Sequence, residues 1–165
     1  AGSGNEEPLE AAVLAICRAE EEPPEFCYDP LSVFTENDVS SNDGFIREDS
    51  HVVVITIGDE GDYSRRMQQG DGVSGAYEDI FGAFDFPVHS ASIGPNYILE
   101  TNEFPCNSSG ATTWSVERLI RIANGTNGIY RPIVVEEDGG CKAAQLEQYF
   151  EDFAEMLHDI RSDNY

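Results

Sequence analysis

The chain has 165 residues, 40% of them hydrophobic, which is enough for one domain with a core of its own. Its 32 Asp and Glu residues outnumber nine Lys and Arg, and the formal charge of -23 disfavours binding to DNA, RNA or anionic lipid. No run approaches the roughly 18 apolar residues that a membrane-spanning helix needs. We therefore expect an acidic domain without a membrane span, in which most carboxylates are simply solvated.

The first expected element is a helix that begins near Pro8, because proline is favoured in the first helical turn. Its apolar residues recur at the spacing of one buried stripe, formed by Leu9, Ala12, Val13 and Ile16. The acidic and proline-containing residues 20–24 (EEEPP) end this helix. Residues 20–50 then form a long polar connection, which a compact domain must anchor to the rest of the fold.

Residues 51–57 (HVVVITI) carry β-branched apolar side chains without alternation, which is the pattern of a strand covered on both faces. This pattern predicts the central strand of a parallel sheet. The acids Asp59, Glu60 and Asp62 follow directly, and Ser64 comes next. Because ligands of open α/β sheets bind outside the carboxyl ends of the strands, we expect a site at this position.

Helices and strands alternate along the remainder of the chain. The expected elements are a helix over 73–84, a strand over 86–93, a helix over 113–123, a strand over 128–135 and a helix over 146–160. This order favours a doubly wound, mostly parallel α/β sheet with helices on both faces. We expect a single domain that spans residues 1–165.

The four cysteines are even in number and form no CxxC pair, which favours disulfides over a zinc site or a redox motif. Disulfides indicate an oxidising setting, so we expect an extracellular, cell-surface or periplasmic protein. Of the three possible connectivities, we predict a bond between Cys17 and Cys27, which ties down the polar connection. The remaining bond, between Cys106 and Cys141, would join the loops after two strands that end on the same face.

Motifs for catalysis are weak in this sequence. Residues 72–76 (GVSGA) lack the last glycine of a GxSxG nucleophile elbow and follow a polar loop. The histidines show no HExxH or paired-ligand spacing, and structural roles are expected for His51, His89 and His158. The carboxylates of Asp59 and Asp62 could form a catalytic pair, so an extracytoplasmic hydrolase is one alternative. We expect no enzyme and assign no catalytic residue.

Several features occur in an order that points to a known family. Residues 4–11 (GNEEPLEA) combine a glycine-containing loop with the start of a Glu-x-Pro-Leu-Glu-Ala helix, and residues 58–64 (GDEGDYS) form an acidic turn after an apolar strand. A strand that ends in Gly94-Pro95, a cysteine in the next loop and a last cysteine before the final helix follow. In these features the chain from Ser3 to Ile160 resembles the carboxyl-terminal two-thirds of a von Willebrand factor type A (VWA) domain, closest to secreted or envelope-attached bacterial members.

This resemblance implies a divalent cation at the carboxyl end of the sheet. In the family an Asp-x-Ser-x-Ser turn, a Thr and an Asp hold the cation, and the carboxylate of the ligand usually completes the shell. Asp59 falls at the place of the last Asp, and with Glu60 and Asp62 it offers the hard oxygen atoms that suit Mg²⁺ or Ca²⁺. The residues expected to contact the ligand are Asn5, Glu6 and Ser64.

The chain departs from the family at its beginning. The Asp-x-Ser-x-Ser strand is absent, since the nearest match at residues 38–42 (DVSSN) lacks the last serine and follows polar residues. The chain also opens without an initiator Met, and we expect a fragment or a processed product. The missing strands would then come from an upstream segment or a second chain, which would complete both the sheet and the metal site.

The expected function is that of a non-enzymatic extracellular binding or adhesion module, which recognises a protein or glycan ligand. A structural subunit of an extracellular assembly is a second alternative. The three readings differ in what they require, because a hydrolase must turn over a substrate and a subunit must associate permanently.

Overall fold

The computed structural model describes residues 7–30, 32–47, 49–64, 75–106, 113–137 and 140–162. The α-helices within these ranges are α1 (Pro8–Cys17), α2 (Gly75–Gly82), α3 (Thr113–Gly125) and α4 (Leu146–Ser162). Two short 3₁₀ helices, η1 (Glu25–Tyr28) and η2 (Glu36–Asp38), follow α1. The strands are β1 (Val52–Ile57), β2 (Val88–Gly94), β3 (Ile129–Pro132), β4 (Val134–Glu137) and β5 (Gly140–Ala143).

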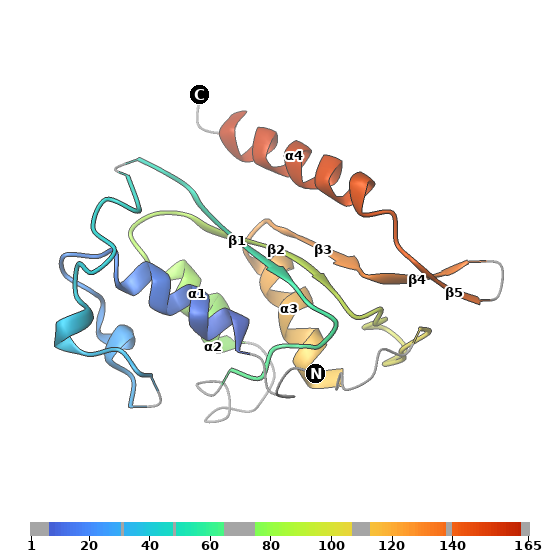
Figure 1. Ribbon diagram of the computed structural model, residues 1–165, viewed down its shortest axis with the longest axis horizontal. Coiled ribbons are helices and arrows are strands. Elements are labelled where there is room, and N and C mark those ends of the chain that lie inside the picture. Colours follow the sequence, from blue (N-terminus) through green and yellow to red (C-terminus); the bar gives the residue numbers. More distant parts are fainter. Residues whose placement is uncertain are drawn as a thin grey trace.

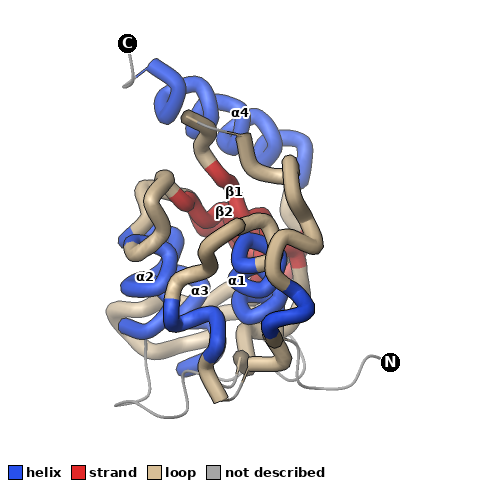
Figure 2. The backbone as a smooth tube through the Cα atoms, turned by 90° about the vertical axis from the view of Figure 1, so that its left-hand side faces the viewer, coloured by secondary structure: helices blue, strands red, loops and turns tan. Residues whose placement is uncertain are grey.

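The described elements form an α/β fold around a parallel sheet with the strand order β1-β2-β3. Helices α1, α2 and α3 lie on one face of this sheet, and α4 lies on the other (Figures 1 and 2). The predicted α/β class, with a parallel sheet and helices packed against it, is therefore confirmed. No helix in the described ranges is long and apolar enough to cross a membrane.

Strand β2, and not β1, is the central strand of the sheet. Every residue of β2 is buried, whereas β1 pairs only with β2 among the described strands. The prediction of a central strand over residues 51–57 is therefore wrong for the sheet as described. On β1, Val54 and Thr56 are buried against the helices, but Ile55 and Ile57 on the opposite face are 51% and 57% exposed. A run of β-branched residues indicates a strand, but it does not reveal whether both faces are covered.

The main core lies between the sheet and helices α1, α2 and α3. Leu9, Val13 and Ile16 of α1 are buried there, as the apolar stripe predicts. Tyr77 and Phe81 of α2 pack into the same core. The predicted helix over 73–84 also has the side chains of Val73 and Ala76 in its stripe, and these lie outside the described part of the chain.

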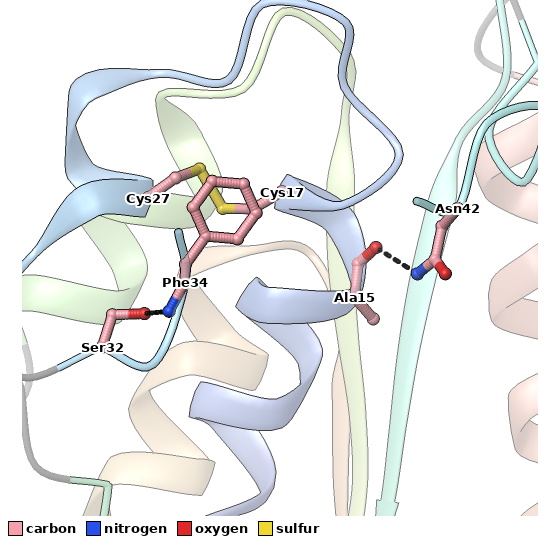
Figure 3. The surroundings of a disulfide bond; sticks show 6 residues. All are labelled: Ala15, Cys17, Cys27, Ser32, Phe34 and Asn42. Atoms are coloured by element: carbon pink, nitrogen blue, oxygen red, sulfur yellow. Dashed lines mark hydrogen bonds between the residues drawn. A yellow bond between two sulfur atoms is a disulfide. The ribbon is translucent and has the colours of Figure 1, made fainter. Parts of the chain in front are cut away.

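The predicted disulfide between Cys17 and Cys27 is confirmed, and both half-cystines are fully buried in the main core. It joins the last residue of α1 to η1, next to the buried ring of Phe34 (Figure 3). Farther along, the side-chain amide of Asn42 donates to the carbonyl oxygen of Ala15 over 3.1 Å. These contacts anchor the polar connection to α1.

A second, smaller core lies between the sheet and α4. Phe153 of α4 is buried against Ala91 and Ile93 of β2. On one side of this contact, Nε of Arg131 in β3 donates to Oδ2 of Asp152 over 2.6 Å. Helix α4 is thus attached near β2 and β3, and it leaves the face of β1 largely uncovered.

The strand predicted over residues 128–135 is divided in two, which corrects the sequence analysis. Strand β3 ends at Pro132, β4 begins at Val134, and β4 pairs with β5 in an antiparallel hairpin that the sequence did not reveal. The ladder with β2 reaches as far as Ile133, whose N–H donates to the carbonyl oxygen of Gly94 over 2.6 Å, and the chain leaves the parallel sheet after this bond. The predicted bond between Cys106 and Cys141 is confirmed, and it ties β5 to the loop after β2.

Candidate functional site

The loop after β1, residues 58–64, contains four of the residues that the sequence singles out. Asp59 is exposed and Glu60 is half-buried, whereas Asp62 and Ser64 are completely buried. The loop begins where the N–H of Gly58 donates to the carbonyl oxygen of Ile93 in β2. The carboxyl end of β1 therefore carries one solvent-facing acid and one enclosed acid within a few residues.

Asp62 and Ser64 cap the amino terminus of α1 from a distant part of the chain. The N–H of Leu9 donates to Oδ1 of Asp62 over 3.2 Å, and the N–H of Glu10 donates to Oγ of Ser64 over 3.0 Å. The Ser64 hydroxyl in turn donates to Oδ1 of Asp62 over 2.6 Å. A helix begins with N–H groups that have no partner in the helix, and Pro8 has no N–H to satisfy. Glu7, at the N-cap position of α1, provides no side-chain cap. Asp62 and Ser64 therefore accept the hydrogen bonds from the first free N–H groups of the helix.

Arg118 of α3 completes the enclosure of Asp62. Its Nη1 donates to the Asp62 carbonyl oxygen over 3.1 Å and lies 3.4 Å from Oδ2 of the same residue. The Arg118 side chain is 2% exposed. Burial raises the pKa of Asp62, while hydrogen bonds from Ser64 and Leu9 and the charge of Arg118 act in the opposite direction. The Asp62 carboxylate thus accepts several hydrogen bonds and forms a structural ion pair with Arg118. Together these contacts join the loop to α1 and α3.

A second buried contact joins α2 to α1. The hydroxyl of Tyr77, which is fully buried, donates to Oε2 of Glu10 over 2.7 Å. Burial is the largest cause that raises the pKa of Tyr77, and the hydrogen bond to Glu10 acts in the same direction. The polar network therefore connects three helices at the carboxyl end of the sheet.

The structure places Asp62 and Ser64 inside this network and away from solvent. Their proposed roles as a metal ligand and a ligand-binding residue stay predictions, but the oxygen atoms that a cation would need already accept hydrogen bonds. Within the described ranges, no group of three or more His, Cys, Asp or Glu residues is arranged to hold a metal ion. The catalytic pair of Asp59 and Asp62 also stays a prediction, with one of its carboxylates enclosed.

Of the three predicted metal ligands, Asp59 and Glu60 take no part in the hydrogen bonds that enclose Asp62. Asp59 is exposed at the end of β1. Oε2 of Glu60 is buried and has no hydrogen-bond partner among the described residues. An ionised carboxylate oxygen of this kind is costly to leave unpaired, so a donor or a cation would stabilise it. Asn5 and Glu6, the other predicted contacts of the ligand, lie outside the described residues.

His51 and His89 meet at the opposite, amino-terminal end of the strands. Nδ1 of His51 lies 3.0 Å from Nε2 of His89, and Nδ1 of His89 lies 2.7 Å from the carbonyl oxygen of Thr126. Because a carbonyl only accepts, neutral His89 carries its proton on Nδ1 and accepts from Nδ1 of His51. The ring centroids are 5.3 Å apart, so the two nitrogens lie between the ring centres and the contact is edge to edge. This arrangement supports the predicted structural roles of both residues.

A cavity of about 680 Å³ lies beside this histidine pair and is also lined by residues of α4. Its charged lining residues include Arg131, Asp152 and Glu155. Arg131 and Asp152 form an ion pair with each other. The cavity lies at the end of the strands opposite the loop with Asp59, and the ion pair between Arg131 and Asp152 in its lining attaches α4 to the sheet.

Strand β1 has one open edge among the described strands, on the side away from β2. The N–H groups of Val52 and Gly58 both donate toward β2. Since backbone groups alternate along a strand, Val53, Ile55 and Ile57 direct their N–H and C=O groups away from β2. The same alternation places their side chains on the face toward α4, where Ile55 and Ile57 are exposed. Val53, Ile55 and Ile57 thus combine backbone groups that point away from β2 with apolar side chains.

No protein-family model, curated protein sequence or solved structure matches this chain. The resemblance to VWA domains therefore rests on the order of sequence features and stays a prediction. The disulfides and the parallel sheet agree with it without being specific for it.

Proposed function

We propose that this chain is a non-enzymatic, extracellular protein-binding module that takes an extended segment of a partner onto the open edge of β1. The observation that carries the proposal is the exposure of Ile55 and Ile57 on a strand whose outward backbone has no partner strand among the described residues. Exposed apolar edge strands readily pair with another segment, and natural proteins usually protect them. Addition of a strand is also a common mode of peptide recognition.

The edge of β1 lacks the usual protection against pairing. Residues 52–57 (VVVITI) contain neither a charge nor a proline, which are the residues that commonly block an edge. An added strand would pair its backbone with Val53, Ile55 and Ile57. It would also extend the sheet to four strands with β1 in the interior, which agrees with the apolar composition of that strand. The doubly wound sheet and the VWA-like architecture belong to this proposal, in which the added strand comes from a second chain.

A cation beside this edge is the second candidate, because it would support adhesion to an acidic group on the partner. The buried oxygen of Glu60, for which the described residues offer no hydrogen-bond partner, and the exposed carboxylate of Asp59 favour it. Both follow β1 directly, so a bound Mg²⁺ or Ca²⁺ would lie at the end of the strand that receives the partner. The two disulfides support the extracellular setting.

The experiment uses a fluorescent synthetic peptide in which valine and lysine alternate, and its binding is measured by anisotropy. Ile55→Pro removes an outward N–H while leaving the ladder to β2 intact, because edge strands tolerate proline where the N–H faces solvent. We expect this variant to bind the peptide at least tenfold more weakly. The control, Ile55→Thr, keeps the N–H and should retain most of the binding.

Amide hydrogen exchange provides the second readout. Bound peptide should protect the N–H groups of Val53, Ile55 and Ile57 and leave those of α2 unchanged. Circular dichroism must show that both variants keep the fold. Equal binding by Ile55→Pro, or protection confined to other segments, would contradict strand addition. A hydrolase would instead turn over substrate, and a permanent assembly subunit would be isolated with its partner already attached.

A further inference from the structure

Helix α4 exposes apolar side chains beside the contact that attaches it. Phe153 is buried against Ala91 and Ile93, but Phe150 and Leu157 are 54% and 44% exposed. A helix that had only to cover the sheet would keep its large apolar residues within the buried stripe. The stripe on α4 is wider than the surface that it covers.

The exposed side of α4 faces β1. Leu157 lines a hollow of about 900 Å³ together with Val53 of β1 and Phe86, which precedes β2. Phe150 precedes Leu157 by about two helical turns and therefore lies on the same side of the helix. Both side chains border the space over β1.

The floor of this space is the uncovered face of β1. Val53 is half-buried, and Ile55 and Ile57 are 51% and 57% exposed. Together with Phe150 and Leu157 of α4, these residues form an apolar surface with two walls, which we call the α4–β1 groove. The floor belongs to the strand that receives the partner in the proposed function.

General strand and helix spacings leave room for one helix beside α4. Neighbouring strands lie about 4.8 Å apart, whereas packed helices lie about 8–10 Å apart. The cluster around Phe153 of α4 includes Ala91 and Ile93 of β2 and Ile129 of β3, and Val53 of β1 packs at its border. A second helix beside α4 would therefore lie about two strands farther on, over β1 and its open edge.

Acidic side chains surround the α4–β1 groove. Glu147 and Glu151 are exposed on α4, and Asp49 and Asp85 line the hollow at the amino-terminal end of β1. Arg47 is the basic residue at that end. The net charge of -23 opposes contact with a second copy of this acidic chain or with an anionic membrane. A basic partner is complementary in charge.

We propose that the α4–β1 groove binds an amphipathic helix of a partner protein, with an apolar stripe toward the groove and Lys or Arg residues along its borders. This inference rests on the proposed function, because a partner whose strand joins the edge of β1 can place a following helix over the same strand. The helix would bury Phe150, Leu157, Ile55 and Ile57 together. Its basic residues would pair with the acids of α4 and of the amino-terminal end.

The test uses two synthetic helical peptides that share one leucine stripe and differ at its borders, which carry Lys and Arg in one peptide and Glu in the other. Binding to the intact chain is measured by fluorescence anisotropy. We expect the basic peptide to bind at least tenfold more tightly than the acidic peptide, and added salt to weaken it. The double variant with Phe150→Ser and Leu157→Ser should lose at least tenfold in affinity. The control Val33→Ser removes a side chain that is 69% exposed outside the groove and should bind normally.

Several results would overturn this inference. These are equal affinity for both peptides, no binding of the basic peptide, or full binding by the double variant. Binding to phosphatidylserine vesicles that the double variant abolishes would show a membrane surface instead. Self-association that the double variant abolishes, measured by sedimentation, would show an interface between copies. If the alternating valine and lysine peptide still binds while the helical peptide does not, the inference fails and the proposed function stands. If the helical peptide binds while the alternating valine and lysine peptide does not, strand addition is refuted and the groove remains supported.

Discussion

Arg118 and Asp62 form a buried ion pair, in which Nη1 of Arg118 lies 3.4 Å from Oδ2 of Asp62 and the side chains are 2% and 0% exposed. The pair joins α3 to the loop that carries the candidate site. Removal of one partner from a buried pair is strongly destabilising, because the other charge loses its compensation. The carboxyl end of the sheet depends on this contact for its shape.

Replacement of Arg118 should therefore destabilise the whole fold. We expect Arg118→Met to lower the free energy of unfolding by about 3–5 kcal/mol, measured by urea denaturation. The matched control is Arg121→Met on the same helix, since Arg121 is 48% exposed and pairs with Glu117 on the surface. That variant should cost less than about 1 kcal/mol. Equal losses would show that the buried pair contributes no more than a surface pair.

The pH dependence of the same variant provides a second check. In Arg118→Met, Asp62 remains buried without its cation, and burial already raises its pKa in the native chain. A folded-state pKa above that of the unfolded chain makes the fold less stable as pH rises through the interval between them. The deficit of the variant should therefore shrink in acid, where Asp62 is protonated. A deficit that stays constant with pH would mean that the charge of Asp62 is not its cause.

The sequence predicted those features that depend on local spacing. The apolar stripe of α1 and the position of β1 follow from residues that are close in the chain, and both agree with the structure. The disulfides were predicted because few pairings are available and the polar connection needs an anchor. Local periodicity and simple counting are sufficient for these elements.

The candidate site was harder to predict because its partners are distant in sequence. Asp62 was expected to face a cation, but it caps Leu9, which lies 53 positions earlier. The acid-rich composition of the loop did not distinguish Asp59 at the surface from Asp62 in the interior. Arg118 left no signal except its apolar helical neighbours, which would have indicated a buried base on α3. The sequence predicted that β1 lacks a neighbour in this chain, but it did not reveal that β2 is the central strand of the described sheet, because strand order depends on tertiary packing.

Close packing around glycine gives another prediction. A Cβ atom added at Gly128 would lie 1.8 Å from the carbonyl oxygen of Ser90, a backbone atom of the central strand. Gly128→Ala must therefore displace β2 or the turn before β3, and we expect a loss of about 2–4 kcal/mol in the free energy of unfolding. Gly82→Ala is the control, because nothing lies within 4 Å of the added atom. Its effect should be neutral or stabilising by up to about 1 kcal/mol. Similar thermal midpoints for the two variants would contradict this packing.

The attachment of α4 to the sheet should weaken at acid pH, when Asp152 becomes protonated. The hydrogen bond from Arg131 is the first cause that lowers the pKa of Asp152 below its ordinary value of 3.8, and a second hydrogen bond comes from Gln148. The stabilisation from ionised Asp152 is therefore present above the unfolded pKa and is lost as pH falls through the folded pKa. Carboxyl NMR of Asp152 should give a midpoint below 3.8 in the native chain. In Arg131→Met the midpoint should move upward, and an unchanged midpoint would show that Arg131 does not contact it in solution.

A cation at the end of β1 is the last testable prediction. The buried oxygen of Glu60, which has no hydrogen-bond partner in the described part of the chain, and the exposed carboxylate of Asp59 predict weak binding of Ca²⁺ or Mg²⁺. Binding should be weak because two carboxylates form only part of a shell for either ion. Calorimetry should detect this binding, and Asp59→Ala or Glu60→Gln should each weaken it severalfold. Asp29→Ala is the control, since it removes an acid beside η1 from a chain with 32 Asp and Glu residues and should leave the affinity unchanged. If all three variants weaken binding equally, the cation is held by the general negative charge. If no heat of binding is detected, the acids of the loop are a solvated turn, and the proposed addition of a strand at the edge of β1 would not involve a metal.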